Sequence, residues 1–303
     1  MSGSRYRELV PQRLPAPVRA LVECAWRAEV PAGAAPHEQR VLPDGCMDLL
    51  LADGRIVVAG PDTAAHVARS VPGSATVGLR FHPGALPALL GVAADAVRDH
   101  RVDLLELIPR GRPAARSAIG STAEMRLTVA GGSADDADVH LGGGGPAARH
   151  GGSGPGARHG GDRTATHRGG TGPVARLGGT GLAALLDTTT ALLAAAEQDR
   201  HRLPEPLPGS ALRALTAGMP AAEVADRVGV TTRTLHRRCL ATLGYGPSVA
   251  RRVLRFRTAT GLLYAGVPPA EVAARAGYAD QPHLSREVRA LAGVSPGELA
   301  PPR

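Results

Sequence analysis

The stretches TTRTLHRRC (residues 231–239) and GYADQPHLSR (residues 277–286) decide the fold of the C-terminal third of the chain. Each belongs to a helix-turn-helix pattern, the first running from Ala221 to Cys239 and the second from Pro269 to Val288. In both copies a short amphipathic helix precedes a tight turn and a second helix rich in polar and basic residues. Such units place the start of their second helix in the major groove, so the duplication predicts a protein that reads DNA.

The first copy has apolar residues at the three-and-four spacing of a helix that buries one stripe. This stripe and the glycine expected at its end are Ala221, Val224, Ala225, Val228 and Gly229. Thr231 or Thr232 can cap the following helix. That helix then presents Arg233, His236 and Arg237 to solvent, with Leu235 and Cys239 facing inward.

The second copy repeats the arrangement. Pro269 suits a first helical turn, and the buried stripe and its closing glycine are Val272, Ala273, Ala276 and Gly277. Asp280 can cap the next helix, whose first turn tolerates Pro282. The side chains available to solvent are Gln281, His283, Ser285 and Arg286, while Leu284 and Val288 face inward.

The second stretch, closed by GVSP (residues 293–296), resembles the signature of AraC/XylS-type transcriptional regulators. The first stretch, followed by GYGP (244–247), is similar to the first helix-turn-helix of that family. RFR (255–257), Ala259 and LL (262–263) resemble the long helix that joins the two units. The resemblance covers residues 205–300. It implies base-edge contacts at Arg233, His236, Arg237, Gln281, His283 and Arg286.

Four positions depart from the family pattern. The family usually has aromatic residues at or near Cys239, Leu284 and Val288, and a small polar residue in place of Pro282. Smaller inward side chains predict a looser core, because losing a buried aromatic typically costs a few kcal/mol. Pro282 also lacks a backbone N–H that could hold a phosphate.

The C-terminal third is strongly basic. Between Ser210 and Arg303 the chain has 13 Arg against 6 acidic residues, so this segment supplies +7 of the formal net charge of +8. One-sided charge attracts phosphates and predicts an affinity that falls steeply with salt. A solvated basic surface is the alternative, but the placement of Arg beside both turns favours DNA. All 35 basic residues are Arg, a bias typical of GC-rich bacterial genomes.

Cysteine content and hydropathy indicate the compartment in which the protein works. Cys24, Cys46 and Cys239 form neither a metal-type pair nor a disulfide framework, which indicates a reducing compartment. No apolar run is long enough for an export signal or a membrane span. We therefore expect a cytoplasmic bacterial protein with no membrane partner, no cofactor and no metal.

We expect no catalytic residue. Cys46 could serve as a nucleophile, but no His stands at an activating spacing, and lone cysteines are usually buried. DNA-repair methyltransferases that carry an AraC-type unit use four cysteines near the N-terminus, whereas this chain has two there.

The first 110 residues predict a small domain of mixed strands and helix. A short amphipathic segment at residues 20–28 surrounds Trp26, and strands are expected at residues 40–51, 55–59 and 75–81. ADGR (52–55) is predicted to form a hairpin turn. A helix is expected from HPG (82–84) through Leu90, closed by Gly91.

This region resembles the N-terminal domain of one bacterial subgroup of AraC-type regulators, on LPDGCMDL (42–49), GP (60–61), GLRFHPGA (78–85), LLGV (89–92) and RVDL (101–104). The resemblance implies a domain that senses a signal or mediates self-association. The polar residues expected to converge are Asp44, Asp48, Arg80 and His82. They form a ligand pocket in which Arg80 binds an anionic group. In the favoured alternative, Asp44 and Arg80 only hold turns.

Residues 131–181 hold 18 of the chain's 39 Gly and repeat ARHGG at 148–152 and 157–161. Apolar side chains are too sparse to offset the entropy of ordering, which predicts a flexible linker. The spaced histidines fit a low-complexity repeat better than a metal site; they are His140, His150, His159 and His167. A helix at residues 182–196 is then expected to pack on the N-terminal domain or against its copy in a dimer.

The predicted fold class is α+β. A small mixed strand and helix domain (residues 1–110) and a low-complexity linker (111–181) precede a helical connector and an all-α double helix-turn-helix domain (182–303, core 205–300). The predicted function is sequence-specific regulation of transcription on double-stranded promoter DNA, with RNA polymerase, an unknown small-molecule effector and a homodimer as further expected partners. Two alternatives stay open: a ligand-binding or enzyme-like N-terminal domain with secondary DNA contact, and an architectural DNA binder.

Overall fold

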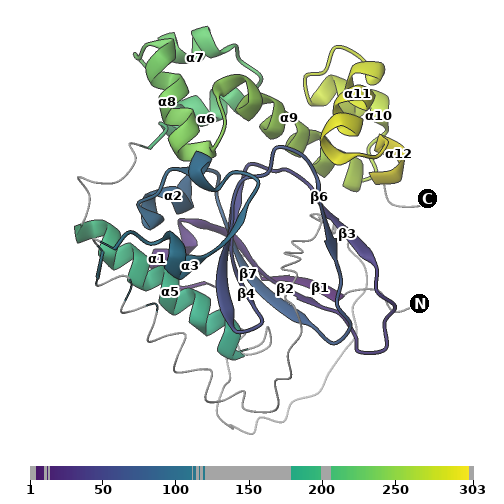
Figure 1. Cartoon of the computed structure of the whole chain (residues 1–303). Helices are drawn as coiled ribbons and strands as arrows, with labels where there is room; N and C mark the ends of the chain where they lie inside the picture. Colours follow the sequence, from purple (N-terminus) through teal and green to yellow (C-terminus); the bar gives the residue numbers. More distant parts are fainter. Residues whose placement is uncertain are drawn as a thin grey trace, which may run out of the picture.

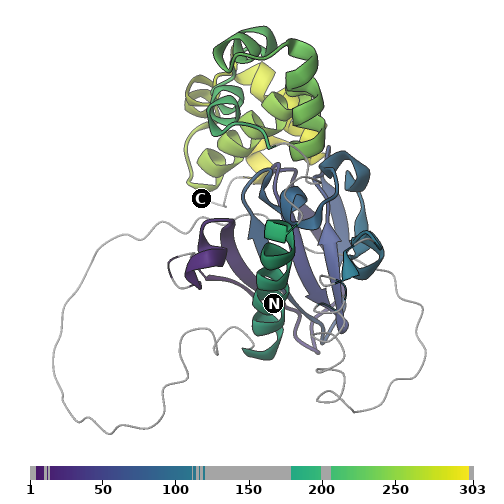
Figure 2. The same cartoon turned by 90° about the vertical axis from the view of Figure 1, so that its left-hand side faces the viewer.

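The computed structural model describes residues 5–9, 12, 14–110, 112–113, 116, 119, 179–198 and 206–299. A strand-rich N-terminal part carries a layer of helices formed by the C-terminal part (Figure 1), and a view turned by 90° shows the same two layers (Figure 2). The predicted α+β class is confirmed. Most of the predicted linker, including its four histidines, lies outside the described residues.

An antiparallel sheet forms the centre of the N-terminal part, with the strand order β1-β2-β7-β4-β5-β8. Its strands are β1 (Arg5–Leu9), β2 (Val22–Glu29), β4 (Met47–Ala52), β5 (Arg55–Ala59), β7 (Ala75–Phe81) and β8 (Arg101–Asp103). A separate antiparallel pair consists of β3 (Glu38–Val41) and β6 (His66–Arg69). The short helical elements here are α1 (Ala16–Arg19), α2 (Ala85–Leu90), the 3-10 turn η2 (Ala94–Val97) and α3 (Leu104–Leu107).

The two faces of the large sheet differ, because successive side chains of a strand point to opposite faces. One face contributes Leu49, Leu79 and Phe81 to the main hydrophobic core. The other face carries a smaller apolar cluster around Trp26. Asp48 and Arg80 alternate with core residues of β4 and β7, so this second face also receives the charged pair described below.

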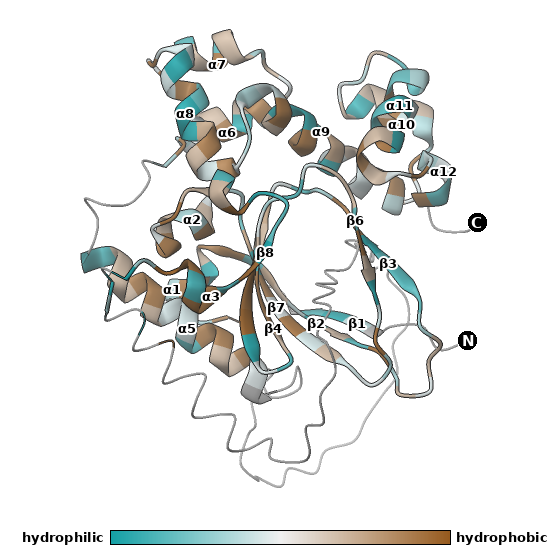
Figure 3. Ribbon diagram, in the orientation of Figure 1, coloured by the Kyte–Doolittle hydropathy of each residue, from teal (hydrophilic) through white to brown (hydrophobic). Residues whose placement is uncertain are grey.

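Helix α5 (Gly179–Gln198) begins at the end of the predicted linker and packs into the N-terminal core. Leu182, Leu185 and Leu192 are fully buried there, and the helix contacts α2, β4 and β7. Figure 3 shows apolar colour along these strands and on α5. Of the two predicted positions for this helix, the one on the N-terminal domain is observed.

The predicted strands at residues 55–59 and 75–81 match β5 and β7, and ADGR forms the hairpin turn between β4 and β5. The prediction of one strand over residues 40–51 is wrong. Pro43 and Gly45 interrupt it, Gly45 with a φ of +78°, and the chain passes from β3 to β4 in a different sheet. Residues 20–28 largely form strand β2. The sequence did not indicate β1, β6 or β8.

The C-terminal part contains seven described helices: α6 (Gly209–Thr216), α7 (Ala221–Arg227), α8 (Thr232–Leu243), α9 (Pro247–Tyr264), α10 (Pro269–Arg275), α11 (Gln281–Ala292) and α12 (Pro296–Leu299). They surround two separate hydrophobic clusters. Helix α9 gives Val253 and Leu254 to the first cluster and Phe256 and Leu263 to the second. It therefore joins the two helix-turn-helix units, as the resemblance implied.

The positions that depart from the family pattern lie inside these clusters. Cys239, Leu284 and Val288 are each fully buried, and Tyr245 and Tyr278 lie in the same two clusters as large buried side chains. Each of the two clusters thus contains a large aromatic side chain in addition to these smaller residues. Among the helices that the structure describes, none has the length and apolar character needed to cross a membrane.

Candidate nucleic-acid interface

The first helix-turn-helix unit, here called reader 1, consists of α7 and α8. Val224 and Ala225 of α7 and Leu235 of α8 are buried together in the first C-terminal cluster. Thr231 caps α8, since its Oγ1 accepts a hydrogen bond from the Thr234 N–H at 3.1 Å. The cap satisfies one of the free N–H groups of the first turn and so holds that turn in helical geometry.

The second unit, reader 2, consists of α10 and α11. Val272 of α10 and Leu284 of α11 are buried together in the second cluster. Asp280 caps α11, because its Oδ1 accepts a hydrogen bond from the His283 N–H at 2.6 Å, which confirms the predicted cap. Pro282 lies in the first turn of α11, where a missing N–H interrupts no helical hydrogen bond.

The residues predicted to contact DNA lie on the accessible sides of α8 and α11. Thr231, Thr232, Arg233, His236, Arg237, Gln281 and Arg286 are exposed, and His283 and Ser285 are half-buried. Within the described part of the chain, no hydrogen bond or ion pair engages the side chains of Arg233, Arg237 or Arg286. These guanidinium groups are available to an external acceptor.

The two histidines are packed against their own units. His283 accepts a hydrogen bond at Nδ1 from the Ala279 N–H at 3.4 Å, and its ring stands edge-on to Tyr278 with the centroids 5.3 Å apart. The His236 ring lies against Gly246, where an added Cβ would come within 2.8 Å of Nε2. Both side chains are therefore more restrained than the neighbouring arginines.

Several arginines of the basic segment hold the protein together. Arg252 of α9 donates from Nε to Glu287 of α11 at 2.7 Å, and the Arg255 guanidinium stacks 4.3 Å from the centre of the Tyr278 ring. Arg257 donates to Glu23 of β2 and so ties α9 to the N-terminal sheet. The net charge of the segment consequently overstates the positive charge that faces solvent beside the recognition helices.

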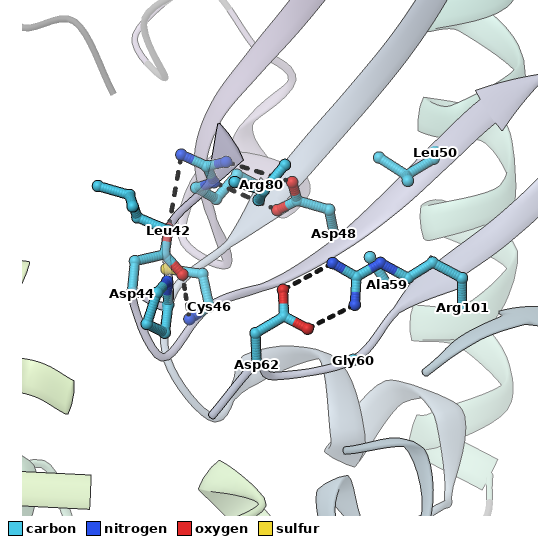
Figure 4. Close-up of a pocket in the computed structure, with 12 residues that line it drawn as sticks. Leu42, Asp44, Cys46, Asp48, Leu50, Ala59, Gly60, Asp62, Arg80 and Arg101 are labelled. Carbon is cyan, nitrogen blue, oxygen red and sulfur yellow. Dashed lines mark hydrogen bonds and ion pairs between the residues drawn. The ribbon is translucent and has the colours of Figure 1, made fainter. Parts of the chain in front are cut away.

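The N-terminal part contains a charged pocket (Figure 4). Asp48 and Arg80 are register partners on adjacent strands β4 and β7. The Arg80 guanidinium lies between two carboxylates, with 3.3 Å from Nε to Asp48 and 3.6 Å from Nη1 to Asp44. Asp44 also accepts the Cys46 N–H at 2.8 Å and so stabilises its own turn. His82 is exposed and does not line this pocket.

Burial and pairing act in opposite directions on this cluster. Burial raises the pKa of Asp48, and Arg80 offsets part of that rise. Burial by itself would lower the pKa of Arg80, but Asp48 and Asp44 outweigh it and raise the pKa well above its usual value. Burial likewise raises the pKa of the Cys46 thiol. No cluster of three metal-ligating side chains occurs in the described residues.

The sequence did not indicate a second ion pair in the same pocket. Arg101 of β8 donates from Nη1 and Nη2 to the two carboxylate oxygens of Asp62, both at 2.6 Å, and each side chain is 10% exposed. The residues are 39 positions apart. Only the pairing of β8 with β5 places Arg101 beside the chain that leaves β5, and no short motif signals this.

Comparison with known proteins agrees with this geometry. Residues 211–300 match the helix-turn-helix domain family, and residues 12–103 match a domain of unknown function, DUF6597. No curated protein matches the chain.

Two crystal structures of ToxT from Vibrio cholerae are similar at 9% and 8% identity. Each aligns with 97% of this chain, over 95% and 96% of their own lengths, with TM-scores of 0.36 and 0.34.

The two readers, the connecting helix α9 and the matched helix-turn-helix family agree with the AraC-type motifs in the sequence. Residues 211–300 thus form an AraC-type helix-turn-helix domain behind a DUF6597 domain, and the chain is a DNA-binding transcription regulator of the AraC type.

Proposed function

We propose that the first turns of α8 and α11 enter two successive segments of the major groove on one face of promoter DNA. The observation that carries the proposal is that both helices begin at a side-chain cap and expose their polar residues there. The proposed contacts are Thr231, Thr232, Arg233, His236, Arg237, Gln281, His283, Ser285 and Arg286.

The side chains of the two readers fit different bases. Arg233 and Arg237 of reader 1 carry forked donors that match the O6 and N7 acceptors of guanine. Gln281 of reader 2 can bind adenine through paired hydrogen bonds. Since His236 and His283 are held by their own units, we assign them a smaller share of base recognition.

For the N-terminal domain we propose a sensing role that biases the placement of the readers. Asp44, Asp48 and Arg80 are the proposed ligand contacts, and His82 has no place in that set because it lies outside the pocket. The cavity of about 30 Å³ admits about one water molecule. An effector would thus have to separate Arg80 from its carboxylates.

We propose that the protein acts by occupying promoters and catalyses no reaction. It works inside the cell, and RNA polymerase and a second copy of the chain are its further proposed partners.

Because α5 packs in the N-terminal core, we place it with residues 1–110 in one domain. The alternative of an enzyme-like domain with secondary DNA contact is not favoured, since the helix-turn-helix match spans both readers.

The experiment is a binding titration of the full-length chain on duplexes selected from a random library. Arg237→Ala and Gln281→Ala should each weaken binding to the selected site by roughly 5- to 150-fold, the value of a bidentate base contact. Arg55→Ala, an exposed arginine in the N-terminal hairpin, is the matched charge control and should change little. If all three variants weaken binding equally, or the selection yields no preferred sequence, the proposal fails.

A further inference from the structure

Both readers contact one short loop of the N-terminal domain, residues 60–65 between β5 and β6, here called the clip. The Tyr245 hydroxyl, directly after α8, donates to the Asp62 carbonyl oxygen at 2.7 Å. The Ala65 N–H donates to the Leu291 carbonyl oxygen in the last turn of α11, also at 2.7 Å. The C-terminal ends of both recognition helices are therefore bound to the same segment, and their DNA-reading first turns lie at the opposite ends.

The clip is itself firmly anchored. The Asp62 carboxylate is held by the bidentate ion pair with Arg101, whose two donors lie 2.6 Å from the two oxygens. Thr63 donates from its N–H and its hydroxyl to Asp99 Oδ1 at 2.6 and 2.9 Å. A paired guanidinium and carboxylate have a fixed relative geometry, so the loop backbone between the readers is restrained.

Residues around the clip make further contacts with both readers. Arg98 donates from Nη1 to the Gly244 carbonyl oxygen at 3.1 Å. Gly244 lies so near Pro61 that an added Cβ would come within 2.5 Å of the proline Cγ. On the other side, Leu42 packs against the hydrophobic cluster of reader 2.

The clip supplies a second connection between the readers. The hydrophobic clusters of reader 1 and reader 2 are separate, and α9 gives residues to each. Reader 1, α9, reader 2 and the clip thus form a closed circuit, in which the clip opposes any change in the separation of the two recognition helices. The circuit is intramolecular and needs no second copy of the chain.

We infer that Asp62 and Arg101 are positioning residues that set the spacing of the two DNA segments the protein recognises. This inference rests on the proposed binding by both readers. A restrained separation of α8 and α11 selects half-sites at one distance along the duplex, since major-groove segments on one face recur about every 10 base pairs. The same ion pair lines the charged pocket, so a ligand that competes for Arg101 acts directly on this spacing.

The test measures preference for spacing with the full-length chain. The probes are the duplex selected by the wild-type protein and the same duplex with two base pairs inserted between its half-sites. Tyr245→Phe removes one hydroxyl from the clip contact, and Asp62→Asn weakens the anchor. Tyr6→Phe removes a hydroxyl on β1 that bonds to Glu8, and Asp53→Asn removes an exposed hairpin carboxylate, so these two are the matched controls.

The ratio compared is the dissociation constant for the lengthened duplex divided by that for the selected duplex. We expect this ratio to fall about fivefold in Tyr245→Phe, the effect of one buried hydrogen bond, and at least as far in Asp62→Asn. The controls should keep the wild-type ratio. If Asp62→Asn does not fold, Tyr245→Phe alone decides. A hydroxyl-radical footprint shows in parallel whether both half-sites are protected. An unchanged ratio in Tyr245→Phe, with both half-sites still protected, overturns the inference and leaves the proposed function intact. Protection of a single half-site by the wild-type protein overturns both.

Discussion

The glycines that end the two recognition helices offer a matched test of how reader 1 sits on the N-terminal domain. Gly244 after α8 and Gly293 after α11 have φ values of +80° and +73°, and each donates its N–H to a carbonyl of its own helix. An L-residue in this conformation costs roughly 1–2 kcal/mol. Gly244→Ala and Gly293→Ala should share this cost.

The two variants differ in what the new methyl group meets. At Gly244 the added Cβ would lie 2.5 Å from Pro61 Cγ and 3.3 Å from the Ala94 carbonyl oxygen, whereas at Gly293 no described atom lies within 4 Å. Forcing an extra carbon into a packed contact typically costs about 1–3 kcal/mol. Gly244→Ala should therefore lose about 1–3 kcal/mol more free energy of unfolding than Gly293→Ala.

The free energy of unfolding is measured by urea denaturation, with two spectroscopic signals that report unfolding. Circular dichroism reports the helices, and the fluorescence of Trp26, the single tryptophan, reports the N-terminal sheet. The extra loss in Gly244→Ala should shift the midpoint of both signals, because the clash lies between the two domains. Equal losses in the two variants would refute the contact between α8 and Pro61.

Three further predictions follow from local geometry. Thr231→Ala and Asp280→Ala should each lower the free energy of unfolding by about 1 kcal/mol and weaken DNA binding, whereas Thr231→Ser and Asp280→Asn, which keep a capping oxygen, should lose only a fraction; a full loss in the conservative variants would contradict the caps. Burial raises the pKa of Cys24 and of Cys239 to about 12 and that of Cys46 well above its usual value, so all three thiols should resist a disulfide reagent at pH 8 and react in urea; rapid reaction of the folded chain would argue against this burial. Gly78→Ala would place a Cβ 2.3 Å from Trp26 Cε2 and should destabilise the N-terminal sheet by about 1–3 kcal/mol with a change in Trp26 fluorescence, and an unaltered spectrum and stability would count against the packing.

The readers could be predicted from sequence because their signals are local. A buried stripe at helical spacing, a cap residue and a closing glycine all lie within one unit of about twenty residues, as at Val224, Thr231 and Gly229. Each unit also packs against α9, but the signals that predict its two helices lie within the unit. The exposed faces of α8 and α11 follow from the same periodicity, so the candidate DNA contacts needed no knowledge of the rest of the chain.

The N-terminal domain was less predictable because its structure depends on partners distant in sequence. Strand β2 is buried on both faces over most of its length and so shows no clean alternation. Strand β8 has only three residues, and it gains meaning through its pairing with β5. The convergence of Asp48 with Arg80 was anticipated, but the Asp62–Arg101 pair and the clip contacts depend on tertiary packing alone.

The most direct test of the central claim is a hydroxyl-radical footprint of the full-length chain on its selected duplex. Two readers held side by side should protect two short segments on one face of the DNA, about one helical turn apart. Gln281→Ala should weaken protection of one segment, and Arg237→Ala that of the other. A single protected segment, or uniform protection that ignores base sequence, would contradict the account.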